Sequence, residues 1–105
     1  MRTYLGEFEQ VLLYALVQLE GEAYGGRIRE LIEARTGRRV SPGAIYTALD
    51  RMEQRGLVSS TLGEATAQRG GKRKRLFTIT ASGRRTLQEL RTIRDRLWRA
   101  IEEGR

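Results

Sequence analysis

Two residue types on which many enzymes and metal sites depend are absent from this sequence. Its 105 residues include no cysteine and no histidine. The lack of cysteine excludes disulfides and thiolate zinc sites. The lack of histidine removes the commonest metal ligand and the commonest general base, so that a lysine or a carboxylate would have to serve as base. We therefore expect no enzymatic activity, no metal site and no cofactor.

Long hydrophobic runs are missing as well. The longest extends from Val11 to Val17, far short of the ~20 residues that a membrane span needs. The first seven residues lack the basic and then apolar layout of a signal peptide. We therefore expect a cytoplasmic protein that does not associate with membranes, and a chain of this length leaves room for one domain.

Positive charge dominates all but the start of the chain. The net charge is +7, with −3 over residues 1–23 and +10 over residues 24–105. Eighteen of the twenty basic residues are arginine, the side chain best shaped for bidentate contact with phosphates and guanine edges. This balance favours nucleic acid as partner, although an arginine-rich genome would also raise the arginine content.

Helix signals predict a helix-turn-helix in the first half. A helix over about 5–20 has apolar residues on two sides, which is typical of a helix packed against both its own domain and a partner. A second helix over 24–36 stops at Gly37. Ser41 as N-cap and Pro42 at the first helical position begin a third, which extends to Arg55. The four-residue turn between the second and third helices contains glycine, as this motif requires.

The second half predicts a wing and a long final helix. Two β-prone stretches, 57–62 and 77–80, flank a polar loop and indicate a hairpin. The loop contains five cations within Arg69–Arg75, which suit phosphates or the minor groove, unless the loop is merely a soluble connection. A helix over about 81–103 carries an apolar side that so small a domain cannot cover, so a partner chain is expected.

These elements predict a mainly α (α+β) fold. Residues 1–80 would form a winged helix-turn-helix DNA-binding domain. Residues 81–105 would form a C-terminal dimerisation helix packed on the same domain.

The third helix is the candidate recognition helix. Its inward residues are Ile45, Leu49 and Met52, and the opposite face carries Gly43, Thr47, Asp50, Arg51 and Gln54, with Tyr46 at the flank. The N-terminal residues of such a helix normally touch base edges. Asp50 fits poorly beside DNA unless it accepts from cytosine or orients Arg51 or Tyr46. The alternative is an ordinary amphipathic helix with a solvated face.

The chain resembles the PadR family of bacterial transcriptional regulators over nearly its full length. The matching stretches are Leu5–Gln10, Ala23–Gly25, Val40–Tyr46 with Leu49, Gly56–Val58, Gly70–Arg75 and Ile79–Gly83. The resemblance implies a homodimer, held by its first and last helices, that represses genes at inverted repeats. It also implies that Tyr24, Ser41, Tyr46, Thr47 and the basic wing meet DNA.

The chain departs from the family at two places. Leu76 and Phe77 stand where the family often has two aromatic residues, and Arg94 stands where drug-binding members have a tryptophan. No drug site is therefore carried over. Trp98 is interpreted mainly as a core or dimer-packing residue, with an effector wall as the alternative, and the identity of any small-molecule effector stays open.

The sequence thus predicts a PadR-like repressor that binds inverted-repeat operator DNA as a homodimer. The predicted DNA-binding residues are Tyr24, Ser41, Gly43, Tyr46, Thr47, Arg51, Lys72, Arg73 and Lys74. The predicted dimer interface comprises Val11, Tyr14, Leu87, Leu90, Ile93, Leu97, Trp98 and Ile101. The alternative function is a winged-helix protein-interaction module whose basic surface binds an acidic partner.

Overall fold

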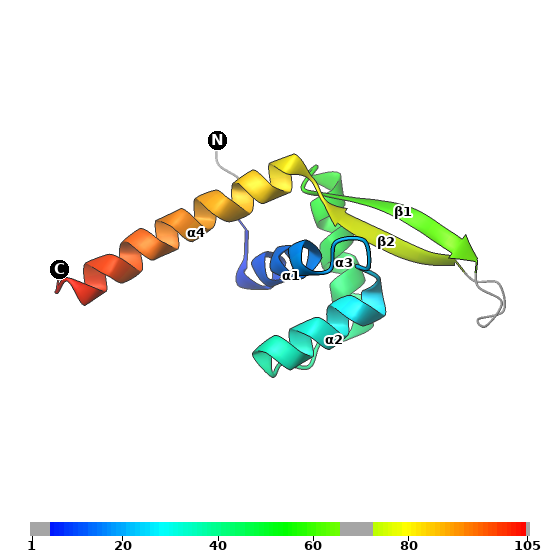
Figure 1. Cartoon of the computed structure of the whole chain (residues 1–105), viewed down its shortest axis with the longest axis horizontal. Helices are drawn as coiled ribbons and strands as arrows, with labels where there is room; N and C mark the ends of the chain where they lie inside the picture. The colour runs from blue at the N-terminus through cyan, green and yellow to red at the C-terminus, as the bar shows by residue number, and fades with distance from the viewer. Residues whose placement is uncertain (1–4, 66–72, 105) are drawn as a thin grey trace.

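The described part of the chain consists of four helices and one two-stranded hairpin. The structure is a computed structural model and describes residues 5–65 and 73–104. In chain order the elements are α1 (Glu7–Gln18), α2 (Gly25–Thr36), α3 (Pro42–Gln54), β1 (Val58–Ala65), β2 (Arg73–Ile79) and α4 (Ala81–Glu102) (Figure 1). Strands β1 and β2 pair antiparallel. This order confirms the predicted mainly α fold, a winged helix-turn-helix with a further helix at each end.

Three helix ends lie where the capping residues predict them. The N–H of Ala44 donates to Ser41 Oγ at 3.1 Å, which caps α3. The N–H of Gly83 donates to Thr80 Oγ1 at 3.0 Å, which caps α4. Helix α2 ends at Gly37, whose φ of 73° lies in the left-handed region that glycine adopts without strain. The turn between α2 and α3 is therefore fixed by local chemistry.

Helix α1 is shorter than its predicted range of about 5–20. Gly6 is the extended residue before the first turn, and its N–H donates to Glu9 Oε1 at 3.0 Å. At the other end, Gly21 with a φ of 85° turns the chain towards α2. The two glycines set the limits of the helix inside the apolar pattern.

The hydrophobic core lies where α1, α2 and α3 meet the hairpin and the first turns of α4. Each helix contributes the apolar face that its periodicity predicts. Side chains with almost no exposed surface include Leu12 and Leu16 of α1, Ile28 and Ile32 of α2, Ile45, Leu49 and Met52 of α3, and Phe77 of β2. Burial of such a side chain stabilises a fold by about 1.5–3 kcal/mol. The core therefore holds α3 and β2 in a fixed relation.

The hairpin is longer than the sequence predicts. The β-prone stretches stop at Leu62 and resume at Phe77, whereas β1 continues to Ala65 and β2 begins at Arg73. Leu62 pairs with Arg75, and the register shifts before Ala65 pairs with Arg73. Backbone hydrogen bonds between strands hold this part of the wing and do not depend on β-prone side chains. Composition alone therefore underestimates the length of the strands.

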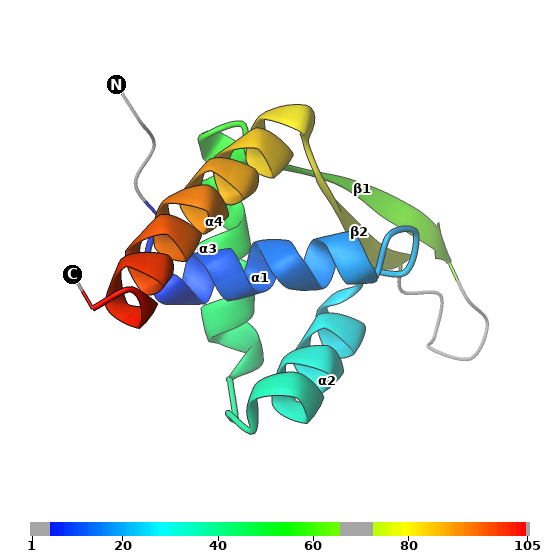
Figure 2. The same ribbon diagram turned by 60° about the vertical axis from the view of Figure 1, so that its left-hand side comes forward.

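The hairpin and α4 leave the body of the domain in opposite directions (Figure 1). The molecule measures 58 × 31 × 21 Å. Helix α1 contacts both α3 and α4, and it crosses in front of α3 in Figure 2. The first turns of α4 belong to the common core, because Gly83 and Leu87 are buried there. The rest of α4 projects away from the domain.

Gly83 lets α4 begin against the backbone of Leu57, the residue before β1, and replacing it with alanine should destabilise the protein. A Cβ on Gly83 would lie 2.2 Å from the carbonyl oxygen of Leu57 and 2.8 Å from Cγ1 of Ile79. Overpacking of this kind typically costs about 1–3 kcal/mol. We expect a lower thermal unfolding midpoint for Gly83→Ala.

The matched control is Gly43→Ala in the first turn of α3, because a Cβ there meets nothing within 4 Å. Its midpoint should equal or exceed that of the parent. Equal midpoints for Gly83→Ala and the parent would contradict the described packing of α4.

Candidate nucleic-acid interface

The outer face of α3 is open to solvent. Gly43, Thr47 and Arg51 are exposed, while Ile45 and Leu49 hold the opposite face in the core. The major groove of B-DNA is wide enough to admit a helix presented in this way. The predicted recognition residues of α3 are therefore accessible.

A hollow of about 200 Å³ lies beside α3, between the start of α2 and strand β2. It is lined by Tyr24, Gly25, Gly26, Arg27, Glu30, Tyr46, Lys74 and Arg75. The first turn of a helix carries partial positive charge and N–H donors that favour anions. Lys74 adds to this field, and the tyrosine hydroxyls can donate hydrogen bonds, whereas Arg27 pairs with Glu30 at 3.6 Å and Arg75 with acidic residues of α3. The chemistry of the hollow suits a phosphate group.

Lys74 and the two tyrosines meet at this hollow. The Nζ of Lys74 lies 5.3 Å from the centroid of the Tyr24 ring, within range for a cation–π contact. Tyr24 also forms an isolated β-bridge with Leu76, which ties the residue before α2 to the wing. The structure therefore brings together two predicted DNA-binding residues, Tyr24 and Lys74, that are 50 positions apart in the chain.

Tyr46 reaches this site because Gly25 leaves space for it. A Cβ on Gly25 would lie only 2.3 Å from Tyr46 Oη and 2.7 Å from Cζ. The ring centroids of Tyr46 and Phe77 are 6.0 Å apart, at an interplanar angle of 50°. The contact with Gly25 was missed in the sequence, where its only signal is the glycine pair at the start of α2.

The remaining predicted wing residues are only partly described. Lys72 lies outside the described residues, and Arg73 is described only by its place in β2. Arg75, counted with the cationic loop from the sequence, turns out to have a different environment. It lies in β2 opposite Leu62, and its side chain points to α3.

Arg75 joins the wing to the recognition helix. Its Nη2 lies 2.8 Å from Asp50 Oδ1 and 2.8 Å from Glu53 Oε1. Its Nε donates to Ser60 Oγ at 3.1 Å, and the Ser60 hydroxyl donates to the Glu53 carboxylate at 2.9 Å. The guanidinium carbon also lies 4.8 Å from the centroid of the Phe77 ring. Asp50, expected to orient Arg51 or Tyr46 if it did not contact cytosine, instead pairs with Arg75.

The charges around Arg75 favour its protonated form. Burial lowers the pKa of its guanidinium, but the hydrogen bonds and negative charges of Asp50 and Glu53 outweigh burial and raise the pKa above its usual value. The side chains of Arg75 and Glu53 are 34% exposed and that of Asp50 is 48% exposed. This cluster is a partly covered ionic network at the junction of α3 and the wing.

The apolar side of α4 changes its surroundings along the helix. Leu87 is only 6% exposed, whereas Leu97, Trp98 and Ile101 are 62%, 61% and 63% exposed. Leu90, Val11 and Tyr14 are partly buried against the core. The predicted interface residues therefore divide into a buried part within the chain, above all Leu87, and an exposed part beyond it. Trp98 does not belong to the core of its own chain.

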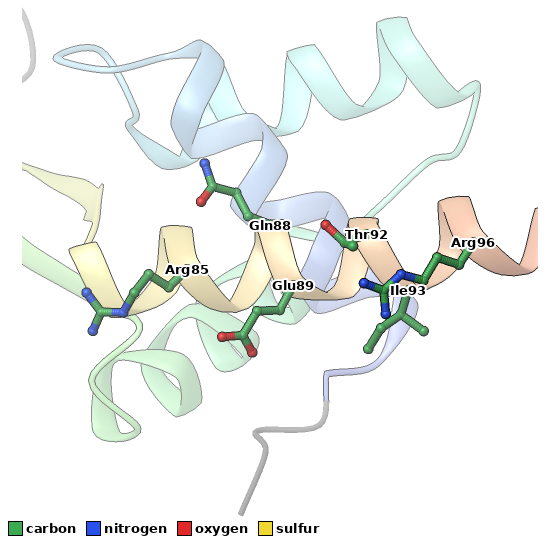
Figure 3. Close-up of a pocket in the computed structure, with 6 residues that line it drawn as sticks. All are labelled: Arg85, Gln88, Glu89, Thr92, Ile93 and Arg96. Atoms are coloured by element: carbon green, nitrogen blue, oxygen red, sulfur yellow. The ribbon is translucent and has the colours of Figure 1, made fainter.

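Arg94 and Ile93 occupy two different flanks of α4. The Nη2 of Arg94 donates to Tyr14 Oη at 2.8 Å, so this arginine contacts α1. Ile93 lines an open hollow together with Arg85, Gln88, Glu89, Thr92 and Arg96, and all six residues belong to α4 (Figure 3). Because one helix supplies the whole lining, this hollow lacks the opposing wall that an enclosed ligand site needs.

Residues 5–65 and 73–104 contain no group of three or more acidic side chains placed to hold a metal ion. None of the helices in these same ranges is long and apolar enough to cross a membrane.

Comparisons with known proteins find a matching family and solved structures of the same fold. The model of the transcriptional regulator PadR-like family matches residues 12–89. A PadR-like transcriptional regulator from Bacillus cereus is 26% identical, with a TM-score of 0.72, over 91% of this chain and 88% of that one. A PadR family transcription regulator from Clostridium difficile is 26% identical, with a TM-score of 0.62, over 92% of this chain and 93% of that one. No curated protein matches.

The adjacent glycines of α2 give a matched pair of variants that tests the position of Tyr46. A Cβ on Gly26 meets nothing within 4 Å, so Gly26→Ala should raise the melting temperature, because alanine favours a helix by up to about 1 kcal/mol over glycine. Gly25→Ala should lower it, because the new Cβ displaces the Tyr46 ring. Equal melting temperatures for the two variants would show that Tyr46 does not need the space over Gly25.

Proposed function

The chain belongs to the transcriptional regulator PadR-like family, and from this premise we propose that it represses transcription by binding inverted-repeat operator DNA as a homodimer. The observation that carries the DNA-binding part is the position of the phosphate-suited hollow beside the exposed face of α3. Regulation of this kind needs no catalytic residue, and none is proposed. The site of action would be the cytoplasm of a bacterial cell.

In the proposed complex, α3 lies in the major groove. Thr47 would bond a base or touch a thymine methyl group, and Arg51 would reach a guanine or a phosphate. Gly43 and Ser41 at the start of the helix would allow close approach and contribute to the helix terminus that favours phosphate. These contacts would supply most of the sequence preference, whereas phosphate contacts would supply most of the affinity.

Phosphates would be held beside α3, at the hollow and along the wing. Tyr24, Tyr46 and Lys74 would bind one phosphate at the hollow beside α2. Lys72 and Arg73 would extend this contact along the wing, towards the next phosphates or the minor groove. The proposed DNA-binding residues would thus share one surface across α2, α3 and the wing.

The proposed dimer covers the exposed end of α4 with a second copy of the chain. Leu97, Trp98 and Ile101 continue the helix side on which Leu87 and Leu90 pack. Tyr14 of α1 adjoins α4 through its hydrogen bond with Arg94, whereas Val11, also partly buried, lies at the groove between α1 and α2. Apolar side chains of this size are seldom left in water together unless they form a binding surface. A two-fold dimer would place its recognition helices roughly 34 Å apart, in successive major grooves.

The phosphate contact is tested by Lys74→Ala. Loss of this cation should weaken binding to all duplexes alike and reduce the dependence of affinity on salt by about one phosphate contact. The measurement is a salt titration of the dissociation constant on one duplex and on random DNA, with Arg99→Ala on α4 as a charge-matched control. An unchanged salt slope for Lys74→Ala would refute the contact. If the parent shows no preference among competing duplexes, the alternative of an acidic protein partner is favoured.

The dimer interface is tested by Leu97→Glu. A charge at this position could not be buried without a partner group, so the variant should sediment as a monomer while the parent sediments as a dimer. Thr92→Glu, on the polar flank of the same helix, should remain dimeric. Sedimentation of Leu97→Glu as an unchanged dimer would contradict the proposed interface.

A further inference from the structure

The recognition helix carries two acidic side chains next to its proposed DNA-binding face. Asp50 lies on the outer side of α3 with Thr47 and Arg51, and Glu53 follows one turn later towards the wing. A carboxylate near the phosphate backbone opposes binding, since duplex DNA carries a dense line of negative charge. Another group must offset these two charges if α3 is to bind DNA.

Arg75 is placed to offset them. A single guanidinium nitrogen, Nη2, lies 2.8 Å from an oxygen of each carboxylate. The remaining contacts of Arg75 fix its direction, because Nε donates to Ser60 Oγ at 3.1 Å and the guanidinium packs 4.8 Å from the Phe77 ring centroid. Ser60 in turn donates to Glu53 at 2.9 Å. The arginine is therefore engaged with the protein on both the α3 side and the strand side.

The neighbouring residue in the strand serves as a contrast. Lys74 lies over the Tyr24 ring at the hollow, where its charge is not paired with Asp50 or Glu53 in the way that Arg75 is. Two adjacent cations of the same basic segment thus have different electrostatic partners. Composition alone would give both the same role.

We propose that Arg75 is a positioning residue for DNA recognition and not itself a DNA contact. It acts by offsetting the charges of Asp50 and Glu53 on α3. This inference rests on the proposed DNA-binding function. It adds that two carboxylates of the recognition helix are tolerated beside DNA only while the wing supplies their cation.

The test is a cycle of four proteins: the parent, Arg75→Gln, the double variant Asp50→Asn with Glu53→Gln, and the combined triple variant. Affinity is measured by fluorescence anisotropy on the duplex that the parent prefers. In the parent background, Arg75→Gln should weaken binding about tenfold, within the range of coupling found for residues of one ionic network. In the background without the carboxylates, the same change should cost no more than about twofold.

Arg51→Gln is the matched control. Arg51 is proposed to touch DNA directly, so its loss should reduce affinity by the same factor in both backgrounds. If Arg75→Gln behaved like Arg51→Gln, with equal losses in both backgrounds, Arg75 would be a direct contact and the inference would be wrong.

A second readout separates charge from folding. The double variant removes the two anionic partners of Arg75 but leaves its contacts with Ser60 and Phe77, so it should lower the melting temperature no more than Arg75→Gln does. Only Arg75→Gln should weaken DNA binding, whereas the double variant should bind more tightly than the parent. Weaker binding by both variants would indicate a purely structural brace and overturn the proposal. A parent that bound no duplex would refute the proposed function. A parent that bound DNA, with both variants binding more weakly, would refute only the role proposed for Arg75.

Discussion

The offset of the two α3 carboxylates by Arg75 is the electrostatic constraint on which the proposed DNA surface depends. The core fixes where α3 and β2 begin, through residues such as Leu49 and Phe77. At the edge of the core, Ser60 of β1 donates to Glu53 of α3, and the rings of Tyr46 and Phe77 lie 6.0 Å apart. Arg75 adds a side-chain link at 2.8 Å to each carboxylate. Arg75 therefore offsets the two carboxylates that would otherwise oppose a duplex beside α3.

The acidic start of the chain has a related role in the fold. Glu7 pairs with Arg38 in the turn before α3, and Glu9 lies 3.6 Å from Arg55 at the end of α3. Exposed pairs of this kind contribute only about 0–1 kcal/mol each. Their larger effect is on the distribution of charge, because two acidic side chains of residues 1–23 offset the positive charges of Arg38 and Arg55. At the hollow beside α3, Arg27 pairs with Glu30 and Arg75 with Asp50 and Glu53, so the proposed phosphate contact relies on Lys74.

Local signals predicted the helices well because the chemistry that starts and stops a helix lies within a few residues. Ser41 and Thr80 cap the helices that they were expected to cap. The full hairpin and the role of Arg75 could not be predicted in this way. Arg75 reaches Asp50, 25 positions earlier, and Ser60, 15 positions earlier. A basic residue in a basic segment gives no sign of such partners before the strands are paired.

The apolar side of α4 illustrates a different limit of sequence reasoning. Leu87 and Leu97 recur at helical spacing on one side, so periodicity treats them alike. The structure separates them, because the domain covers Leu87 and ends before Leu97. Periodicity predicts which side of a helix is apolar, but the extent of the domain decides which part of that side remains for a partner.

The most direct test of the whole account is the selection of bound sequences from a pool of random duplexes by the intact protein. Two outward-facing α3 helices related by a two-fold axis should select an inverted repeat, with half-sites about one helical turn apart. Enrichment of such a site would support both the proposed DNA surface and the proposed dimer. A pool that remained random, or that converged on a single unrepeated half-site, would contradict the account.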